Sequence, residues 1–140
     1  EKNILTTIRL EQMLQGNYGT IGIDKKLKQL IEVIKRSEKN IYAVLDHKQK
    51  FAGIIELNDI KQKLFEPASF NTVSVKSVMK KPPAVLFDDE NMLTAMEKFD
   101  ISNSWYLPVL TRERDFVGFV SKTKVFKKYR EILADQGDLY

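Results

Sequence analysis

The chain has 140 residues, 43% of them hydrophobic and 30% charged, which is the balance of one compact globular domain or two small ones and excludes a disordered chain. It contains no cysteine and one histidine, which excludes a disulfide scaffold, thiolate metal sites and a multi-histidine zinc site. The 23 Lys and Arg residues exceed the 19 Asp and Glu residues by a small margin and are interrupted by acids, so we expect no nucleic-acid partner.

The first half of the chain predicts a strand, a helix, a hairpin and a second helix. A short strand is expected at 20–23. The following apolar residues have helical spacing: Leu27, Leu30, Ile31 and Ile34. Two apolar runs, 41–45 and 51–55, flank a polar connection and therefore predict a β-hairpin. A last helix is expected to start near Asn58.

An ungapped offset of 65 residues places the second half of the chain on the first. It aligns Gly53 with Gly118 (118 − 53 = 65) and the run 41–45 with 106–110. The helical stripe falls on another set of apolar residues: Met92, Ala95, Met96 and Phe99. The sequence therefore contains one β-α-β-β-α unit twice. Asp24 in the first copy, and Asp88 or Asp89 in the second, are expected to begin the first helices.

The repeat predicts an α/β (α+β) fold of two units packed with pseudo-two-fold symmetry. We expect the first unit, with an N-terminal lead-in, at 1–70 and the second, with a C-terminal helix, at 71–140. A single unit of about 55 residues buries too little surface to be more than marginally stable. Pairing the two units is therefore expected to protect both cores, and the stretch Phe65–Thr72 is the predicted linker.

Three sequence features resemble a pair of CBS domains, also called a Bateman module. They are the Val-x-x-Val-Met lead-in at Val75–Met79, the Tyr-Leu-Pro-Val strand at Tyr106–Val109, and the glycine-bearing strand followed by a polar turn. The resemblance covers nearly the whole chain. It implies a non-catalytic module that binds adenosine-type nucleotides in clefts between its units and regulates an attached enzyme, transporter or channel.

Within that family, 118–130 and 98–109 look most like the cytoplasmic tail of a bacterial CLC-type chloride channel or antiporter. This likeness implies a module at the cytoplasmic face of the cell membrane, with a membrane-embedded channel part in the same chain. Because the first residue is Glu1 rather than Met, we expect a longer parent protein, although no apolar run here reaches the roughly 18 residues that span a bilayer. A metal-ion transporter or a metabolic enzyme is the alternative host.

The resemblance also implies a homodimer that assembles through the CBS helices. The last helix of each unit is expected to present an apolar face too large for a monomer to leave exposed. The residues expected on these faces are Ile60, Leu64, Val125, Phe126 and Tyr129. A purely structural dimerisation module with no ligand is the alternative function.

Family members that bind nucleotides carry Gly-h-h-Ser/Thr-x-x-Asp after the glycine strand, where h is apolar. The hydroxyl at a helix start binds phosphate, and the Asp accepts hydrogen bonds from the ribose. The first copy has Asp59 but places Glu56 at the hydroxyl position, where a carboxylate repels phosphate. The second copy has Ser121 but places Lys124 at the Asp position, where an ammonium donates only.

Each copy therefore predicts half of a nucleotide site. The ribose is expected on Asp59 and the phosphates near Ser121, Thr123 and Lys124, with AMP, ADP or ATP as the candidate ligands and no obligatory cofactor. The remaining candidate contacts are Tyr42, Tyr106, Pro108 and Thr20. In the alternative interpretation Asp59 is an ordinary acid at a helix start and Ser121 is a helix cap, and neither role needs a ligand.

The sequence predicts neither an enzyme nor a metal site. The single histidine, His47, lies in a predicted turn, and no Gly-x-Gly-x-x-Gly or Walker loop is present. Asp88, Asp89 and Glu90 offer oxygen atoms of the kind that Mg²⁺ prefers. Acids immediately before a helix are typical of capping, and we favour that role here.

Overall fold

The computed structural model describes residues 2–14 and 18–137 and divides them into two compact units. Unit 1 takes its residues from Glu1–Gln15, Pro83–Arg112 and Val117–Tyr140, and unit 2 from Gly16–Pro82 and Glu113–Phe116. Each unit contains a small three-stranded sheet with helices, so the predicted mixed fold class is confirmed. These units do not follow the predicted boundary between residues 70 and 71.

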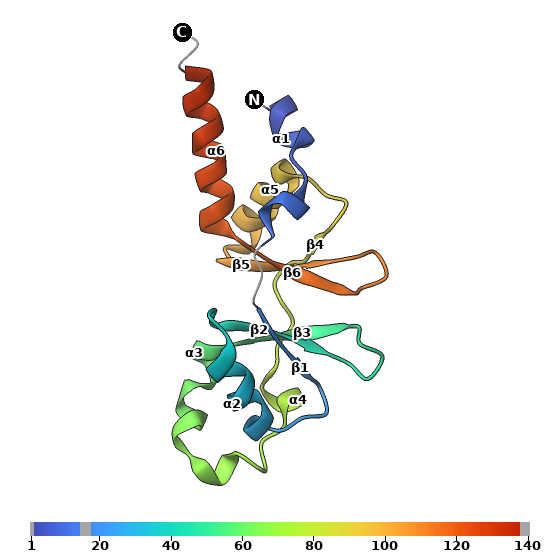
Figure 1. Cartoon of the computed structure of the whole chain (residues 1–140), viewed down its shortest axis with the longest axis vertical. Helices are drawn as coiled ribbons and strands as arrows, with labels where there is room; N and C mark the ends of the chain where they lie inside the picture. Colours follow the sequence, from blue (N-terminus) through green and yellow to red (C-terminus); the bar gives the residue numbers. More distant parts are fainter. Residues whose placement is uncertain (1, 15–17, 138–140) are drawn as a thin grey trace. The chain divides into compact units, whose positions relative to one another are not determined.

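Unit 2 contains the first sheet (Figure 1). Its elements are β1 (Gly19–Gly22), α2 (Leu27–Arg36), β2 (Ile41–Leu45), β3 (Phe51–Glu56), α3 (Leu57–Ile60), the 3-10 turns η2 (Lys61–Phe65) and η3 (Pro67–Ser69), and α4 (Val75–Val78). The strand order is β1-β2-β3, with β1 parallel and β3 antiparallel to β2. The predicted linker therefore lies within unit 2 as short 3-10 turns, where Lys28 N donates to Phe70 O at 2.8 Å.

Unit 1 contains the second sheet and both ends of the described chain. Its elements are α1 (Lys2–Thr7), the 3-10 turn η1 (Leu10–Met13), β4 (Leu86–Phe87), α5 (Met92–Ser102), β5 (Tyr106–Leu110), most of β6 (Phe116–Ser121) and α6 (Lys122–Gly137). The strand order is β4-β5-β6, and β4 runs parallel to β5 with Leu86 opposite Val109. Figure 1 shows α1 beside α5, although they are far apart in the sequence.

Each unit has its own hydrophobic core, built on the predicted helical stripes. In unit 1 the core comprises Leu5, Leu10, Met13, Leu86, Met92, Ala95, Phe99, Leu107, Val109, Val120 and Val125. In unit 2 it comprises Ile21, Leu27, Leu30, Val33, Tyr42, Val44, Ile55, Ile60 and Val75. The continuous apolar strands β2 and β5 are buried over most of their lengths, as runs without polar alternation predict.

The lead-in segments explain why the units differ from the predicted boundary. Leu27 N donates to Val73 O at 2.8 Å, and 65 residues further along Met92 N donates to Ile8 O at 2.9 Å. Each lead-in thus binds the first helix of the other repeat. The 65-residue offset identifies equivalent positions in the two copies, but it carries no information about which copy a lead-in contacts.

The first helices of both repeats begin later than predicted. The Lys26 backbone N–H precedes α2 and donates to Gln29 Oε1 at 3.0 Å, while Asn91 Oδ1 caps α5 by accepting from Thr94 N at 3.0 Å. The prediction that Asp24 and its counterparts start these helices is therefore wrong by about one turn. The reason is that Asp88 N still donates to Leu110 O at 2.9 Å, which extends the strand pairing past that residue.

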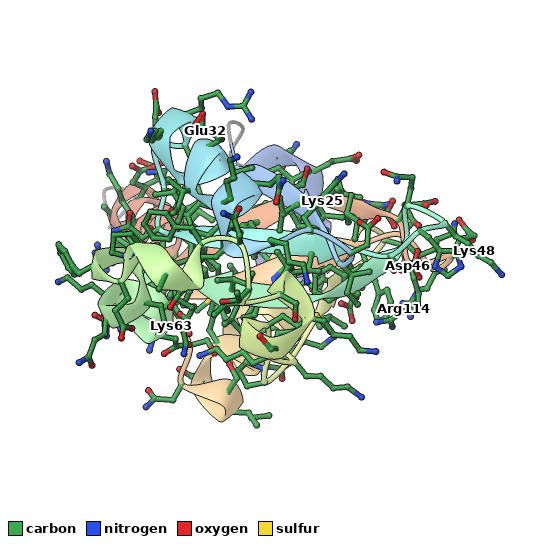
Figure 2. All side chains as sticks on the ribbon, turned by 90° about the horizontal axis from the view of Figure 1, so that it is seen from below. Lys25, Glu32, Asp46, Lys48, Lys63 and Arg114 are labelled. Atoms are coloured by element: carbon green, nitrogen blue, oxygen red, sulfur yellow. The ribbon has the colours of Figure 1, made fainter. Side chains whose placement is uncertain are left out.

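Both hairpins turn through equivalent left-handed residues. Gln49 has φ 64° and Arg114, its counterpart 65 positions later, has φ 72°. In the first turn, which Figure 2 labels at Asp46 and Lys48, the Asp46 carboxylate accepts from the backbone N–H groups of Lys48 at 2.8 Å and Lys50 at 3.0 Å. These bonds are the main reason that the pKa of Asp46 lies below its usual value.

The apolar helix faces expected to drive dimerisation point into the units instead. Ile60 and Val125 are buried, and the other three predicted residues, Leu64, Phe126 and Tyr129, pack partly buried against their own cores. That argument for a homodimer is therefore wrong. Among the described residues, the exposed large apolar side chains are Ile4, Phe65, Ile101, Trp105 and Val117. Across residues 2–14 and 18–137, no helix combines the length and apolar character needed to cross a bilayer.

Candidate ligand-binding site

The acidic half of the predicted site, Asp59 and the neighbouring Glu56, lies in unit 2. One lysine forms ion pairs with both carboxylates. Asp59 is in the first turn of α3, and Glu56 ends β3 directly before that helix. Lys80 Nζ lies 2.7 Å from Asp59 Oδ2 and also pairs with Glu56 Oε2. Hydrogen bonds from the ammonium group, to Asp59 first and to Glu56 second, raise the pKa of Lys80.

A backbone contact positions this lysine. Lys80 N donates to Ile54 O at 2.9 Å, and Ile54 N donates to Lys80 O at 2.8 Å, so the residue forms a single antiparallel bridge with β3. The neighbouring Gly53 leaves the room for that bridge, because a Cβ atom there would lie 2.9 Å from Lys80 O. The glycine that defines the motif in the first copy is therefore needed for close approach of the backbone.

Lys80 changes what Asp59 can do. An ion pair already occupies one oxygen of the carboxylate that would accept hydrogen bonds from a ribose. A nucleotide must displace the ammonium group or share Asp59 with it. Lys80 is not predictable from the sequence motif, because it lies 21 positions away from Asp59 and matches no spacing rule (80 − 59 = 21).

The hydroxyl half of the predicted site lies in unit 1, at the start of α6. Ser121 is 6% exposed, and its Oγ accepts from Lys124 N at 3.0 Å. This bond is that of a helix cap, as the alternative interpretation predicts. Thr123 and Lys124 are exposed in the first turn of the helix. The structure thus brings Ser121 and Lys124 together through the helix backbone.

The other predicted contacts differ in their access to a ligand. The Tyr42 side chain is 1% exposed in the core of unit 2, and this burial raises its pKa. Pro108 is buried within β5, and Tyr106 is half-buried at its start. Thr20 is exposed on β1, beside a depression of about 560 Å³. Tyr42 and Pro108 therefore serve packing in this structure.

The acids before α5 are engaged in ion pairs within unit 1. Arg112 donates to Asp89 through Nε at 2.9 Å and Nη2 at 2.8 Å, which lowers the pKa of Asp89. Glu90 Oε1 accepts from Lys98 Nζ at 3.0 Å and from Phe87 N at 2.7 Å. In the described part of the chain, no three acidic or histidine side chains are grouped as metal ligands.

The ion pairs of Lys80 predict a loss of stability at high pH. A lysine whose pKa is raised by folding stabilises the protein fully below the ordinary lysine value of 10.5, and this contribution disappears as the pH rises through the raised value. We expect Lys80→Met to cost about 1 kcal/mol near neutral pH, because the three side chains are nearly half exposed. Urea unfolding of the unmodified chain and of Lys80→Met measures that difference, which should shrink only as the pH rises above 10.5.

Lys61→Met is the control, because Lys61 is exposed and is not part of this cluster. Its effect on the free energy of unfolding should be small and should not depend on pH in the same range. Equal costs for the two variants at every pH would contradict the prediction.

Comparison with known proteins identifies the fold. Residues 75–131 match the family model described as the CBS domain. A CBS domain-containing protein of unknown function from Bacillus anthracis superposes with a TM-score of 0.81 at 18% identity, covering 94% of this chain and 99% of that one. CbpB, solved in complex with c-di-AMP, superposes with a TM-score of 0.76 at 15% identity, covering 99% and 95%.

The predicted resemblance is thereby confirmed: residues 75–131 match the CBS-domain model, and the chain has the fold of solved CBS-domain pairs. A curated relative, chloride channel protein CLC-f from Arabidopsis thaliana, is 28% identical over 98 residues. That alignment covers 67% of this chain and 12% of the channel protein, so this chain matches only a small part of its relative.

Proposed function

We propose that this chain is a regulatory module that binds an adenine nucleotide and transmits that binding to a host protein. The observation that carries the proposal is the position of Asp59 and Ser121, each in or beside the first turn of the helix that follows a glycine-bearing strand. The CbpB structure supports the ligand class, because that protein is similar in fold and binds c-di-AMP.

Lys80 supplies a route from binding to conformational change. A ribose that takes both oxygens of Asp59 breaks the ion pair between Lys80 and Asp59 and leaves Lys80 paired with Glu56 alone. Lys80 also forms a backbone bridge to Ile54 in β3, so the bound and free states differ in how firmly the segment around Lys80 is held. A nucleotide biases the host only to the extent that it binds one of these two states more tightly.

The host that we propose is a chloride channel or transporter of the CLC type. The similarity to CLC-f supports this host. In the proposed arrangement the module lies at the cytoplasmic face of the cell membrane, beside a membrane-embedded part of the same protein. The module would act there as a homodimer. A metal-ion transporter or a metabolic enzyme is the alternative host, and a binding experiment does not depend on which of them is correct.

Two contacts favour a second function, that of a structural module without a ligand. Lys80 pairs with Asp59 and Glu56 within unit 2, and the Ser121 hydroxyl caps α6. Both motif residues therefore have roles in folding that need no nucleotide. The two functions make opposite predictions for the effect of nucleotides on thermal stability.

Thermal unfolding with AMP, ADP, ATP or c-di-AMP tests the proposed function. A ligand at about 100 times its dissociation constant should stabilise the module by about 2.7 kcal/mol, which raises the unfolding midpoint by several degrees. Asp59→Asn should abolish that rise, because the amide replaces an acceptor oxygen with a donor. Glu56→Gln, the matched control, removes the other partner of Lys80 and should retain the rise or enlarge it.

The same series of measurements identifies the structural alternative. If none of the four nucleotides moves the midpoint of the unmodified chain at millimolar concentration, nucleotide binding is excluded in that range and the structural function is favoured. Equal loss of the rise in both variants would show that Lys80, and not Asp59, matters for binding.

A further inference from the structure

A groove of about 460 Å³ lies in unit 1, between the N-terminal segment and α6. Ile8, Gln12 and Met13 line it from the N-terminal segment. The side chains that line it from α6 are Lys124, Lys127, Lys128 and Glu131. Its volume lies within the range of roughly 300–1,000 Å³ that is typical of small-molecule sites.

The α6 side of this groove carries an uncompensated positive charge. Its four residues are spaced by three and four positions, so they lie on one face of the helix, and three of them are lysines. Lysines three or four positions apart on a helix repel one another by about 0.2–0.5 kcal/mol per pair. Within residues 2–14 and 18–137, no ion pair involves any of these three lysines.

The first repeat shows that this charge is not a general feature of the repeated unit. The positions 65 residues earlier are Asp59, Gln62, Lys63 and Glu66, which contain two acids and one lysine. In that repeat Lys80 supplies the positive charge that Asp59 needs. In the second repeat the helix itself is positive, and no ion pair within the described residues offsets the charge of its lysines.

The spacing of the lysines suits an anion with several charged groups. Lys124 and Lys128 are four residues apart, which corresponds to about 6 Å along the helix axis and matches two or three linked phosphates. Ammonium groups bind phosphate oxygens as compact point charges with charge-assisted hydrogen bonds. On the opposite side, Ile8 and Met13 line the groove with apolar side chains, and Gln12 adds an amide.

We propose that this groove binds a chain or cluster of phosphate groups, from a soluble oligophosphate or from a lipid headgroup. Neither a base nor a ribose is required, so the inference does not rest on the proposed nucleotide site, with which the groove shares only Lys124. Lys127 and Lys128 are exposed, and they are the groups that distinguish this groove from that site.

Binding to the unmodified 140-residue chain tests the proposal in two arms. Calorimetry with sodium tripolyphosphate measures a soluble source, and co-sedimentation with phosphatidylcholine vesicles, with and without phosphatidic acid, measures a lipid source. The variant is Lys127→Gln with Lys128→Gln. The control is Lys61→Gln with Lys63→Gln, which removes the same charge from exposed positions in unit 2 (Lys63 is labelled in Figure 2).

We expect saturable binding in at least one arm at an ionic strength of about 0.15 M, where screening suppresses diffuse charge effects. The groove variant should weaken that binding about tenfold, which corresponds to about 1.4 kcal/mol for two exposed ion pairs. The control should change it less than about twofold by the same measure. The arm that responds identifies the source of the phosphate.

Two results would overturn the proposal. One is the absence of saturable binding in both arms. The other is an equal loss in the groove variant and the control, because binding would then follow net charge and not this groove. If no nucleotide moves the unfolding midpoint of the unmodified chain while tripolyphosphate still binds, the proposed nucleotide site fails and this inference stands, so the two proposals fail separately.

Discussion

A fragment of residues 16–82 should unfold cooperatively, whereas a fragment of residues 1–70, of nearly equal length, should not. The reason is the exchange of lead-in segments between the two repeats. Val75 is fully buried in the core of unit 2, and Val78 and Met79 pack against that core. The fragment 1–70 ends before all three of these residues. Each fully buried aliphatic side chain contributes about 1.5–3 kcal/mol to the free energy of unfolding, and a domain of this size is only marginally stable.

The fragment 1–70 also retains a segment that has lost its partners. Leu5, Leu10 and Met13 are buried in unit 1 against residues such as Met92 and Phe99, which this fragment lacks. These side chains would be exposed to solvent. Circular dichroism during urea titration compares the two fragments. A cooperative transition of equal midpoint in both would contradict the exchange of lead-ins as the basis of the two units.

Much of the fold was predictable because burial within one repeat leaves a periodic pattern. Leu27 and Leu30, like Met92 and Phe99, show the spacing of a helix that buries one face, and all four are buried. The uninterrupted apolar run 41–45 predicts a strand enclosed on both sides, and it forms β2. Such signals depend only on neighbours in sequence, and tertiary structure did not override them here.

The candidate site was less predictable because its geometry depends on contacts that are distant in sequence. Asp59 and Glu56 were found from the motif, and the repulsion of phosphate by Glu56 stays a prediction from charge alone. Lys80, which pairs with both carboxylates, is positioned beside them by the backbone bridge that it forms with Ile54. No periodicity or spacing encodes a single bridge of this kind.

Gly53→Ala should destabilise the protein by about 1–3 kcal/mol, which is the usual cost of inserting a methyl group into a well-packed site. The new Cβ would lie 2.9 Å from Lys80 O and 3.3 Å from Met79 Sδ, and the first of these is a backbone atom that cannot turn away. This steric overlap can be relieved only if β3 and the segment around Lys80 move apart. The lower entropy of unfolded alanine offsets less than about 1 kcal/mol of this cost.

Gly22→Ala is the matched control, because its Cβ would meet an atom at the same distance that is free to move. That atom is Asp24 Oδ1 at 2.9 Å, the end of a side chain that is exposed and can rotate. Neither glycine has a positive φ, so conformational strain does not separate the two substitutions. Urea unfolding should therefore show a change within about 0.5 kcal/mol for Gly22→Ala, as for an ordinary surface substitution.

Combining Gly53→Ala with Lys80→Met connects the packing of the glycine to the ion pairs of the lysine. If the added methyl group pushes Lys80 away from Asp59, the lysine substitution should cost less in the Gly53→Ala background than in the unmodified chain. A double-mutant cycle measures this coupling, which is expected to exceed about 0.5 kcal/mol for residues in direct contact. Strictly additive costs would show that Gly53 supports the backbone bridge but does not control the position of the Lys80 ammonium group. The proposed coupling between Gly53 and the ion pairs of Lys80 would then be wrong.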